Sequence, residues 1–212
     1  NDCVGGIIGR VYYGTVIDCT NEGAVSGSSR VGGIVGYAYE TEAIIDCTNE
    51  GTVTGEDMVG GIIGYEDDCF GIIYCTNEGE VKGRDYVGGI IGDADDFYCV
   101  VTVIDCTNEG TVSGHGYVGG IVGETYWYAV ISGCANEGTV SGGNYVGGII
   151  GYSHGDEVIG FTNYGTVNGS NEEVSEIIDE ICVIEVIGCT NEGEVKGRDY
   201  VGGIIGDADD FY

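Results

Sequence analysis

Clusters of acidic residues are the strongest candidates for chemistry in this sequence. Each cluster follows a Val-Gly-Gly-Ile word, so we expect the clusters to lie in variable loops. Carboxylates are the hard oxygen ligands that calcium prefers, although the spacing matches neither the EF-hand nor the glycine-rich calcium-binding nonapeptide. The alternative is a solvated acidic surface that keeps β-rods from associating side by side. The candidate calcium ligands are Glu66, Asp67, Asp68, Asp93, Asp95 and Asp96.

Some of these carboxylates are also the only candidates for catalysis. Parallel β-helices host polysaccharide lyases and hydrolases in which carboxylates act on a sugar chain. However, four of the six basic residues lie in duplicated copies of one segment, and no Ser/His/Asp order, phosphate loop or His-Glu-x-x-His motif is present. We therefore expect no enzymatic activity and no cofactor beyond weakly bound calcium. The residues that a polysaccharide-active site would use are Asp67, Asp68, Asp95 and Asp96.

Six of the ten cysteines recur at one position of a repeat, and Phe161 fills that position in another copy. Because phenylalanine replaces cysteine there, the position is expected to be apolar and inward, which favours a column of buried free thiols. Disulfides between adjacent coils remain an alternative, since a Cα separation of about 4.8 Å is permitted, and Cys69 could pair with Cys99. No Cys-x-x-Cys pair supports a zinc site. The column contains Cys19, Cys47, Cys75, Cys106, Cys134 and Cys189.

The composition excludes several classes of protein and partner. The 212 residues include 43 glycines, no proline, and 36 acidic against 6 basic residues, which gives a formal charge of −30. This charge repels nucleic acid backbones and anionic membrane surfaces. No apolar run approaches the roughly 18 residues of a membrane span, so we expect no membrane insertion. Because the chain starts at Asn1 without Met or a signal peptide, we expect a processed product or an excised piece.

Self-similarity indicates the fold. The word Cys-Thr-Asn-Glu-Gly and its variants recur at spacings of 28, 28, 31, 28, 27 and 28 residues, and Val-Gly-Gly-Ile follows the same period. A fixed period marks a repeat protein whose units bury their apolar sides against each other. Each unit is rich in Val, Ile and Thr and is broken by glycine-bearing turns, which is typical of β-strands. We expect three strands per coil, illustrated by Thr15 to Cys19, Ala24 to Ser26 and Val31 to Val35.

The predicted fold is an all-β parallel β-helix, or β-solenoid, with about 28 residues per coil and roughly 7.5 coils. It forms a single domain over residues 1–212. Residues 174–179 depart from the repeat. Ser170 and Glu173 form a capping box that favours a helix, whereas the unbroken 28-residue period favours a distorted coil. Both readings of the coil at 170–185 stay open.

Residues that recur in every copy are expected to stack into ladders. An inward-turned asparagine amide can donate to the amide above and accept from the one below. The glutamate after each asparagine is expected to form an outward column, and the next glycine a corner with positive φ. Tyr86, Tyr117 and Tyr145 are expected to stack face to edge. The asparagine ladder contains Asn21, Asn49, Asn77, Asn108, Asn136, Asn163 and Asn191.

The segment Val31-Gly32-Gly33-Ile34-Val35-Gly36, preceded by Asn21-Glu22-Gly23-Ala24-Val25-Ser26-Gly27, resembles the GLUG motif. Such repeats occur in large secreted or surface-anchored bacterial proteins, including adhesins and non-catalytic portions of immunoglobulin A proteases. The resemblance covers nearly the whole chain. It implies an extracellular or cell-surface setting and a stalk or binding role, and it transfers no catalytic residue.

Two functional hypotheses follow. The chain is a structural or adhesive segment of a bacterial surface protein, which binds a host protein or glycan through loops such as 124–129 with Trp127. Alternatively, it is the subunit of an extracellular filament in which coils of separate chains stack end to end. Residues 75–98 and 189–212 are identical, which indicates a longer repetitive array or a duplication. We expect the coil ends to be adhesive because open sheet edges pair with other strands.

Overall fold

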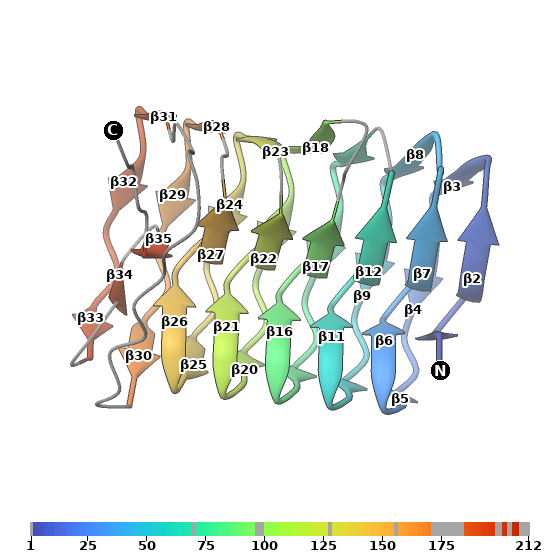
Figure 1. Ribbon diagram of the computed structural model, residues 1–212, viewed down its shortest axis with the longest axis horizontal. Helices are drawn as coiled ribbons and strands as arrows, with labels where there is room; N and C mark the ends of the chain where they lie inside the picture. Colours follow the sequence, from blue (N-terminus) through green and yellow to red (C-terminus); the bar gives the residue numbers. More distant parts are fainter. Residues whose placement is uncertain are drawn as a thin grey trace.

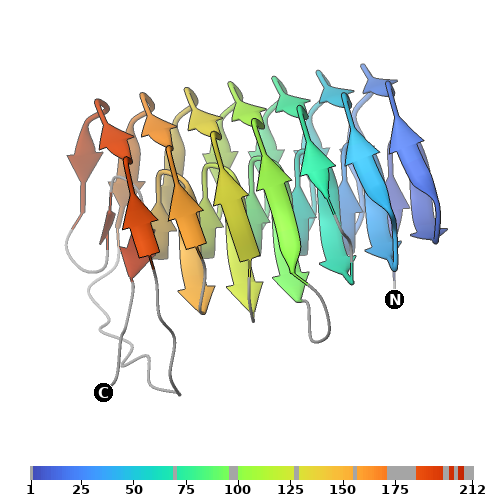
Figure 2. The same cartoon turned by 90° about the horizontal axis from the view of Figure 1, so that it is seen from above.

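The computed structural model describes residues 2–68, 71–95, 100–126, 129–154, 157–170, 185–197, 201–202 and 205–207. The chain winds through five parallel sheets, each made of seven stacked strands. Figure 1 shows the coils following one another along the long axis, with the N-terminus at the right, and Figure 2 shows the same stack from above. The predicted all-β parallel β-helix is confirmed.

From Val4 to Gly169 every coil passes through the five sheets in the same order, whereas the next described strand, Glu185–Ile187, belongs to the third sheet. Sheet 1 contains β1 (Val4–Gly5), β6 (Ser29–Gly32), β11 (Asp57–Gly60), β16 (Asp85–Gly88), β21 (Gly116–Gly119), β26 (Asn144–Gly147) and β34 (Val201–Gly202). Sheet 2 contains β2 (Ile8–Tyr12), β7 (Val35–Tyr39), β12 (Ile63–Asp67), β17 (Ile91–Asp95), β22 (Val122–Tyr126), β27 (Ile150–His154) and β35 (Ile205–Asp207). Sheet 3 contains β3 (Thr15–Ile17), β8 (Ala43–Ile45), β13 (Ile72–Ile73), β18 (Val101–Ile104), β23 (Ala129–Ser132), β28 (Glu157–Ile159) and β31 (Glu185–Ile187).

The last two sheets are built from the shortest strands. Sheet 4 contains β4 (Thr20–Asn21), β9 (Thr48–Asn49), β14 (Thr76–Asn77), β19 (Thr107–Asn108), β24 (Ala135–Asn136), β29 (Thr162–Asn163) and β32 (Thr190–Asn191). Sheet 5 contains β5 (Val25–Ser26), β10 (Val53–Thr54), β15 (Val81–Lys82), β20 (Val112–Ser113), β25 (Val140–Gly142), β30 (Val167–Gly169) and β33 (Val195–Lys196).

Each coil from β1 to β30 therefore contains five strands, and the expectation of three was wrong. The expected strand from Val31 to Val35 is two strands, because the chain turns at Gly33 and Ile34 between β6 and β7. The backbone amides at this turn bond to the next coil; the Ile34 amide donates to the Ile62 carbonyl at 3.0 Å. Main-chain groups are thus satisfied between coils even where a strand bends.

The interior consists of two apolar columns. Valines from sheets 1 and 5 fill the first, including Val31, Val53 and Val59, and all three are fully buried. Sheets 2 and 3, with the corners that flank them, fill the second with isoleucine, valine, alanine, cysteine and Phe161. Equivalent residues of successive coils lie directly above one another, since Val31 pairs with Val59 and Val59 with Val87. Each coil therefore buries its apolar residues against the next, as the repeat predicted.

The glycine of Asn-Glu-Gly recurs for a reason other than the positive φ that the sequence suggested. Gly51 and Gly79 do not have a positive φ. A β-carbon at Gly51 would overlap the carbonyl oxygen of Gly23, and one at Gly79 would overlap that of Gly51. These positions are restricted to glycine because adjacent coils approach closely there.

The left-handed corners lie elsewhere in the coil. The residue before each cysteine of the column, and the residue before Phe161, has φ between 50° and 69°. These residues are Asp18, Asp46, Tyr74, Asp105, Gly133, Gly160 and Gly188. The residue before Val-Gly-Gly is also left-handed in five coils, at Arg30, Met58, Tyr86, Tyr117 and Tyr145. Such a backbone costs free energy for any residue with a β-carbon, so the packing of the coils must hold these residues in place.

Several expectations fall outside the described residues. They concern the helix or distorted coil at 170–185, of which residues 171–184 are not described, the pairing of Cys69 with Cys99, and the positions of Asp96 and Trp127. In the described ranges, no helix is long and apolar enough to cross a membrane.

Candidate functional site

The asparagine ladder runs through all seven coils and is confirmed. Each Nδ2 donates to the Oδ1 of the asparagine in the next coil at 2.7–2.8 Å, from Asn21 to Asn191. Each Nδ2 also donates to the carbonyl oxygen two residues ahead, as Asn77 does to Gly79 at 2.8 Å. The five asparagines from Asn49 to Asn163 are completely buried. Because both amide hydrogens and the oxygen are paired, the ladder is a structural element.

The cysteine column lies in the larger apolar core. Cys47, Cys75, Cys106 and Cys134 are buried and free, whereas Cys19 and Cys189 are half-buried. Their thiols donate weakly to backbone carbonyls, as Cys75 does to Ile44 at 3.6 Å. The thiol of Cys106 and burial help to raise the pKa of Cys75 to about 12. A protonated, buried thiol is a poor nucleophile, so the column has the character of a core element.

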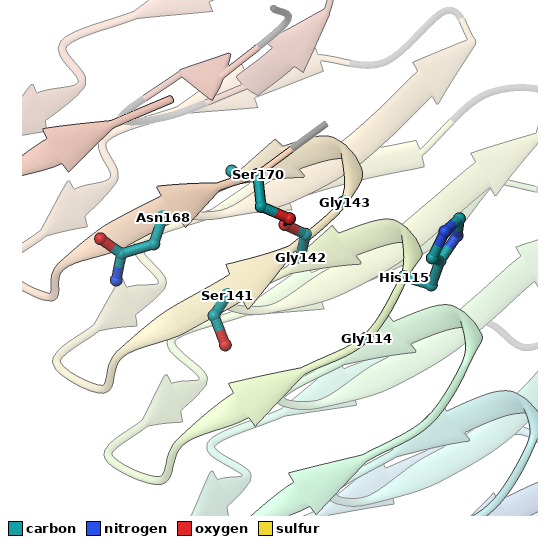
Figure 3. A pocket seen from close by; sticks show the side chains of 8 residues that line it. Gly114, His115, Ser141, Gly142, Gly143, Asn168 and Ser170 are labelled. Carbon is teal, nitrogen blue, oxygen red and sulfur yellow. Dashed lines mark hydrogen bonds between the residues drawn. The ribbon is translucent and has the colours of Figure 1, made fainter. Parts of the chain in front are cut away.

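A hollow of about 320 Å³ lies at the corner between sheets 5 and 1 (Figure 3). It exists because Gly143 has no side chain at a corner position that His115 occupies in the preceding coil; the Gly143 amide donates to the His115 carbonyl at 2.9 Å. The Ser141 hydroxyl donates to Val112 and the Ser170 hydroxyl to Gly142. Figure 3 shows the His115 imidazole on the other side of the hollow from Ser141. No nucleophile and base pair is therefore formed.

The predicted acidic clusters lie largely in strands, and their placement in loops was wrong. Glu66 and Asp67 belong to β12, and Asp93 and Asp95 to β17. These strands extend past the Val-Gly-Gly-Ile word because each is paired in register with the strands of both neighbouring coils. Only Asp68 follows the end of β12.

The structure separates Glu66 from the other predicted calcium ligands. Glu66 is completely buried at a position whose register partners are Ala38 and Ala94, both buried. Its side chain therefore points into the coil, where two small neighbours leave room for it. Asp67, Asp93 and Asp95 lie on the outward side of the same sheet. Within the described ranges, no three His, Cys, Asp or Glu side chains have a geometry that could hold a metal ion.

The outward side of sheet 2 carries residues that differ from coil to coil. The sixth residue after the valine of Val-Gly-Gly forms a row that we call the inner row. Adjacent members are register partners in neighbouring strands. The inner row consists of Arg10, Tyr37, Tyr65, Asp93, Glu124 and Tyr152, and its register continues to Asp207 in β35.

A second column of side chains faces the inner row from sheet 1. It contains the left-handed residues Arg30, Met58, Tyr86, Tyr117 and Tyr145. Glycines bring the two sheets together: a β-carbon at Gly92 would meet the backbone of Met58 and Val59, and one at Gly64 that of Arg30. This close approach places each residue of the facing column beside the inner-row residues of its own coil and of the next coil.

Arginines lie over tyrosine rings in the N-terminal half of this surface. The Arg10 guanidinium is 4.7 Å from the centre of the Tyr37 ring and 5.3 Å from that of Tyr12. The Arg30 guanidinium lies over Tyr37 and Tyr65 at 5.3 and 5.4 Å. Tyr37 also donates its hydroxyl to Asp67 at 2.9 Å. These cation–π contacts engage both arginines and the tyrosines of this half within the chain.

Two carboxyl groups occupy the middle of the inner row. Asp93 and Glu124 are register partners in β17 and β22, and Asp93 is only 7% exposed. Burial, together with the charge of Asp95, raises the pKa of Asp93 to about 7. Burial and the charges of Asp93 and Asp95 raise the pKa of Glu124 to about 8. Two adjacent desolvated carboxyls disfavour double ionisation, so the pair holds a proton near neutral pH.

The facing tyrosines stack beside this pair. The rings of Tyr86 and Tyr117 are 5.0 Å apart and inclined by 2°, and those of Tyr117 and Tyr145 are 4.9 Å apart and inclined by 13°. The predicted face-to-edge arrangement was wrong, because in-register coils hold equivalent rings parallel. Tyr152 meets Tyr117 and Tyr145 edge to face. Burial and the charge of Glu124 help to raise the pKa of Tyr86 to about 12.

Sequence reasoning missed the convergence of Asp93 and Glu124, although their constant offset of six residues from the valines could have revealed it. It placed Glu124 in a binding loop, whereas Glu124 lies in β22. The glutamate column after the asparagines faces solvent as expected, and Tyr164 interrupts it; the exposed members are Glu22, Glu50, Glu78, Glu109, Glu137 and Glu192. The unusual chemistry therefore lies in the inner row.

Comparisons with known proteins identify related sequence and fold. Residues 1–26 and 27–54 each match the family model of the GLUG motif. The crystal structure of a proposed immunoglobulin A1 protease from Bacteroides ovatus matches with a TM-score of 0.57 and 19% sequence identity. The match covers 87% of this chain and 66% of that one, and at this identity it shows a shared fold alone. No curated protein matches the sequence.

Proposed function

Because the chain is a GLUG-repeat β-solenoid, we propose that it is a rigid, non-catalytic stalk segment of a secreted or surface-anchored bacterial protein. The observation that carries this proposal is the asparagine ladder, which joins all seven coils by side-chain hydrogen bonds. A spacer must transmit orientation over its length, and a ladder without a break holds every coil to its neighbours.

The assignment as non-catalytic is supported by what the repeats contain. Residues that recur in every coil pair with their own copies, whereas an active site needs unique groups that converge. The unique groups of the inner row are carboxyls, tyrosines and Arg10, whose guanidinium lies over tyrosine rings, and the serines at the hollow donate to the backbone. Release of cleaved fragments from immunoglobulin A1 by the purified chain would contradict this part of the proposal.

Distance measurement by electron spin resonance tests the rigid stalk. Spin labels are attached through unnatural amino acids at Glu22 and Glu137, which are exposed, so that the native cysteines are not modified. Four coil spacings separate these positions, or about 19 Å. We expect one narrow distance distribution, unchanged by moderate salt. A broad distribution comparable to that of the urea-unfolded chain would contradict the proposal.

Axial self-association into a filament is a second candidate. It is favoured by the identity of residues 75–98 and 189–212, since a sequence that pairs with neighbouring coils at one place along the stack is repeated at another. Sedimentation velocity over a range of concentrations tests it. Growth into long species supports the filament, and a monomer at all concentrations leaves only the stalk.

A further inference from the structure

Two groups of four outward residues occupy corresponding places in sheet 2. The first consists of Arg10 and Tyr12 in β2 with Tyr37 and Tyr39 in β7. In it, Arg10 lies over Tyr12 and Tyr37, and Tyr12 meets Tyr39 edge to face at 5.5 Å. The Arg10 guanidinium is thus already in contact with aromatic rings of the same chain.

The second group, which we call the acidic quartet, consists of Asp93 and Asp95 in β17 with Glu124 and Tyr126 in β22. Asp93 pairs with Glu124, and Asp95 with Tyr126. Tyr126 is 42% exposed. Where the first group has an arginine and three tyrosines, the quartet has three acids and one tyrosine. Its rows and spacing are the same, but it contains three carboxyl groups and no cation of its own.

The carboxyl of Asp93 points to a ligand independently of this comparison. It is more than nine-tenths buried on the outward side of β17, and no described residue donates a hydrogen bond to it. Arg30 is the one basic group that acts on it electrostatically, yet the two form no ion pair, and Arg30 Nε is itself buried without a partner. No described basic residue acts on Glu124, whose charged neighbours are Asp93 and Asp95.

We propose that the acidic quartet binds arginine side chains of a basic protein segment. A planar guanidinium can donate two parallel hydrogen bonds to a carboxylate, here Glu124, with the proton that the pair holds remaining on Asp93, while its face lies against the Tyr126 ring. Binding then supplies to this half of the surface the cation that Arg10 supplies to the other. The formal charge of −30 attracts a basic partner. This inference names the ligand of the proposed stalk and therefore rests on that function.

The test is calorimetric titration at physiological salt with a blocked tetra-arginine peptide, compared with tetra-citrulline and tetra-lysine peptides. Citrulline keeps the shape and removes the charge, whereas lysine keeps the charge and removes the planar fork. We expect tetra-arginine to bind at least about tenfold more tightly than either. Shifts in the ring signals of labelled Tyr126 on binding locate the peptide.

A matched pair of double variants distinguishes the quartet from the acidic surface in general. Asp93→Asn with Glu124→Gln should weaken tetra-arginine binding about tenfold or more, whereas Glu50→Gln with Glu137→Gln removes at least as much negative charge from the exposed column and should change it less than about twofold. If the first double variant does not fold, Glu124→Gln alone serves.

Equal losses in both double variants, or equal affinity for arginine and lysine peptides, would overturn the proposal. Binding of neutral cellohexaose in place of tetra-arginine, lost in the Asp93→Asn and Glu124→Gln variant, would overturn it in favour of a glycan. The spin-label distances do not depend on the quartet, so failure here with a narrow distribution there leaves the stalk intact.

Discussion

Gly61 lies against the side-chain amide of Asn77, so closely that a β-carbon on Gly61 would overlap it. The second glycine of Val-Gly-Gly-Ile and the asparagine of Cys-Thr-Asn-Glu-Gly therefore depend on each other. The same contact joins Gly33 to Asn49 and Gly89 to Asn108. The two recurring words of the sequence are thus two sides of one interior contact.

Replacement of this glycine should be costly. Gly61→Ala forces a methyl group against the Asn77 amide and the Gly89 carbonyl, and we expect a loss of about 2 kcal/mol or more in the free energy of unfolding, measured by urea titration. Gly71→Ala is the control, since its nearest neighbour would be the Ile73 side chain at 3.4 Å. Equal effects of the two variants would contradict the shared contact.

Removal of one ladder amide should destabilise the fold. Asn77→Ala leaves the Asn49 amide hydrogen and the Asn108 oxygen without their partner, and an unsatisfied buried polar group costs about 1–3 kcal/mol. Thermal and urea unfolding measure the loss. The adjacent Thr76→Ala should change stability by less than about 0.5 kcal/mol, and an Asn77→Ala effect that small would argue against a structural ladder.

Stability should fall as pH rises from about 4 to 8. Unfolded Asp and Glu have pKa values near 3.9 and 4.3, whereas folding raises that of Asp93 to about 7 and that of Glu124 to about 8. In this interval the folded state binds more protons than the unfolded state, so each increase in pH lowers the free energy of unfolding. The cost of ionising the two buried carboxyls is absent below this interval and complete above it.

Melting temperature against pH provides the measurement. The double variant Asp93→Asn with Glu124→Gln should show a shallower decline than the Glu50→Gln and Glu137→Gln control. Parallel curves for the two variants would show that the decline comes from the overall negative charge.

Calcium should bind weakly and stabilise the chain without being required for folding. Neighbouring carboxylates about 4.8 Å apart repel by roughly 0.9 kcal/mol in water, and a divalent cation relieves this repulsion. We expect a modest, saturable rise in melting temperature with added calcium. Complete unfolding in chelator would mean that the metal has a larger structural role.

The sequence predicts the repeat, the parallel stacking and the ladder because each depends on residues that recur at one period. It could not show which side chains turn outward in sheet 2. Ile34 and Val35 are consecutive and both fully buried, because the chain turns between sheets 1 and 2 and the alternation of inward and outward residues restarts there. Alternation counted from the valine of Val-Gly-Gly would therefore place Glu66 outward and Asp93 inward, which is the reverse of their orientation in the structure.

The positions that need glycine were also only partly predictable. The recurring spacing indicates that position 51 requires glycine. One sequence does not distinguish a requirement for positive φ from a requirement for close approach between coils, because both are met by glycine. The left-handed corner at Tyr74 carries no glycine at all, since contacts between coils hold it there.

The most direct test of the account is nuclear magnetic resonance of the asparagine side chains. In protein labelled with nitrogen-15 and carbon-13 asparagine, we expect couplings across the hydrogen bonds from Nδ2 of one asparagine to the carboxamide of the next, with slow hydrogen exchange of the buried amides from Asn49 to Asn163. Rapid exchange of these amides with no couplings would contradict a single ladder that holds the coils together as one rod.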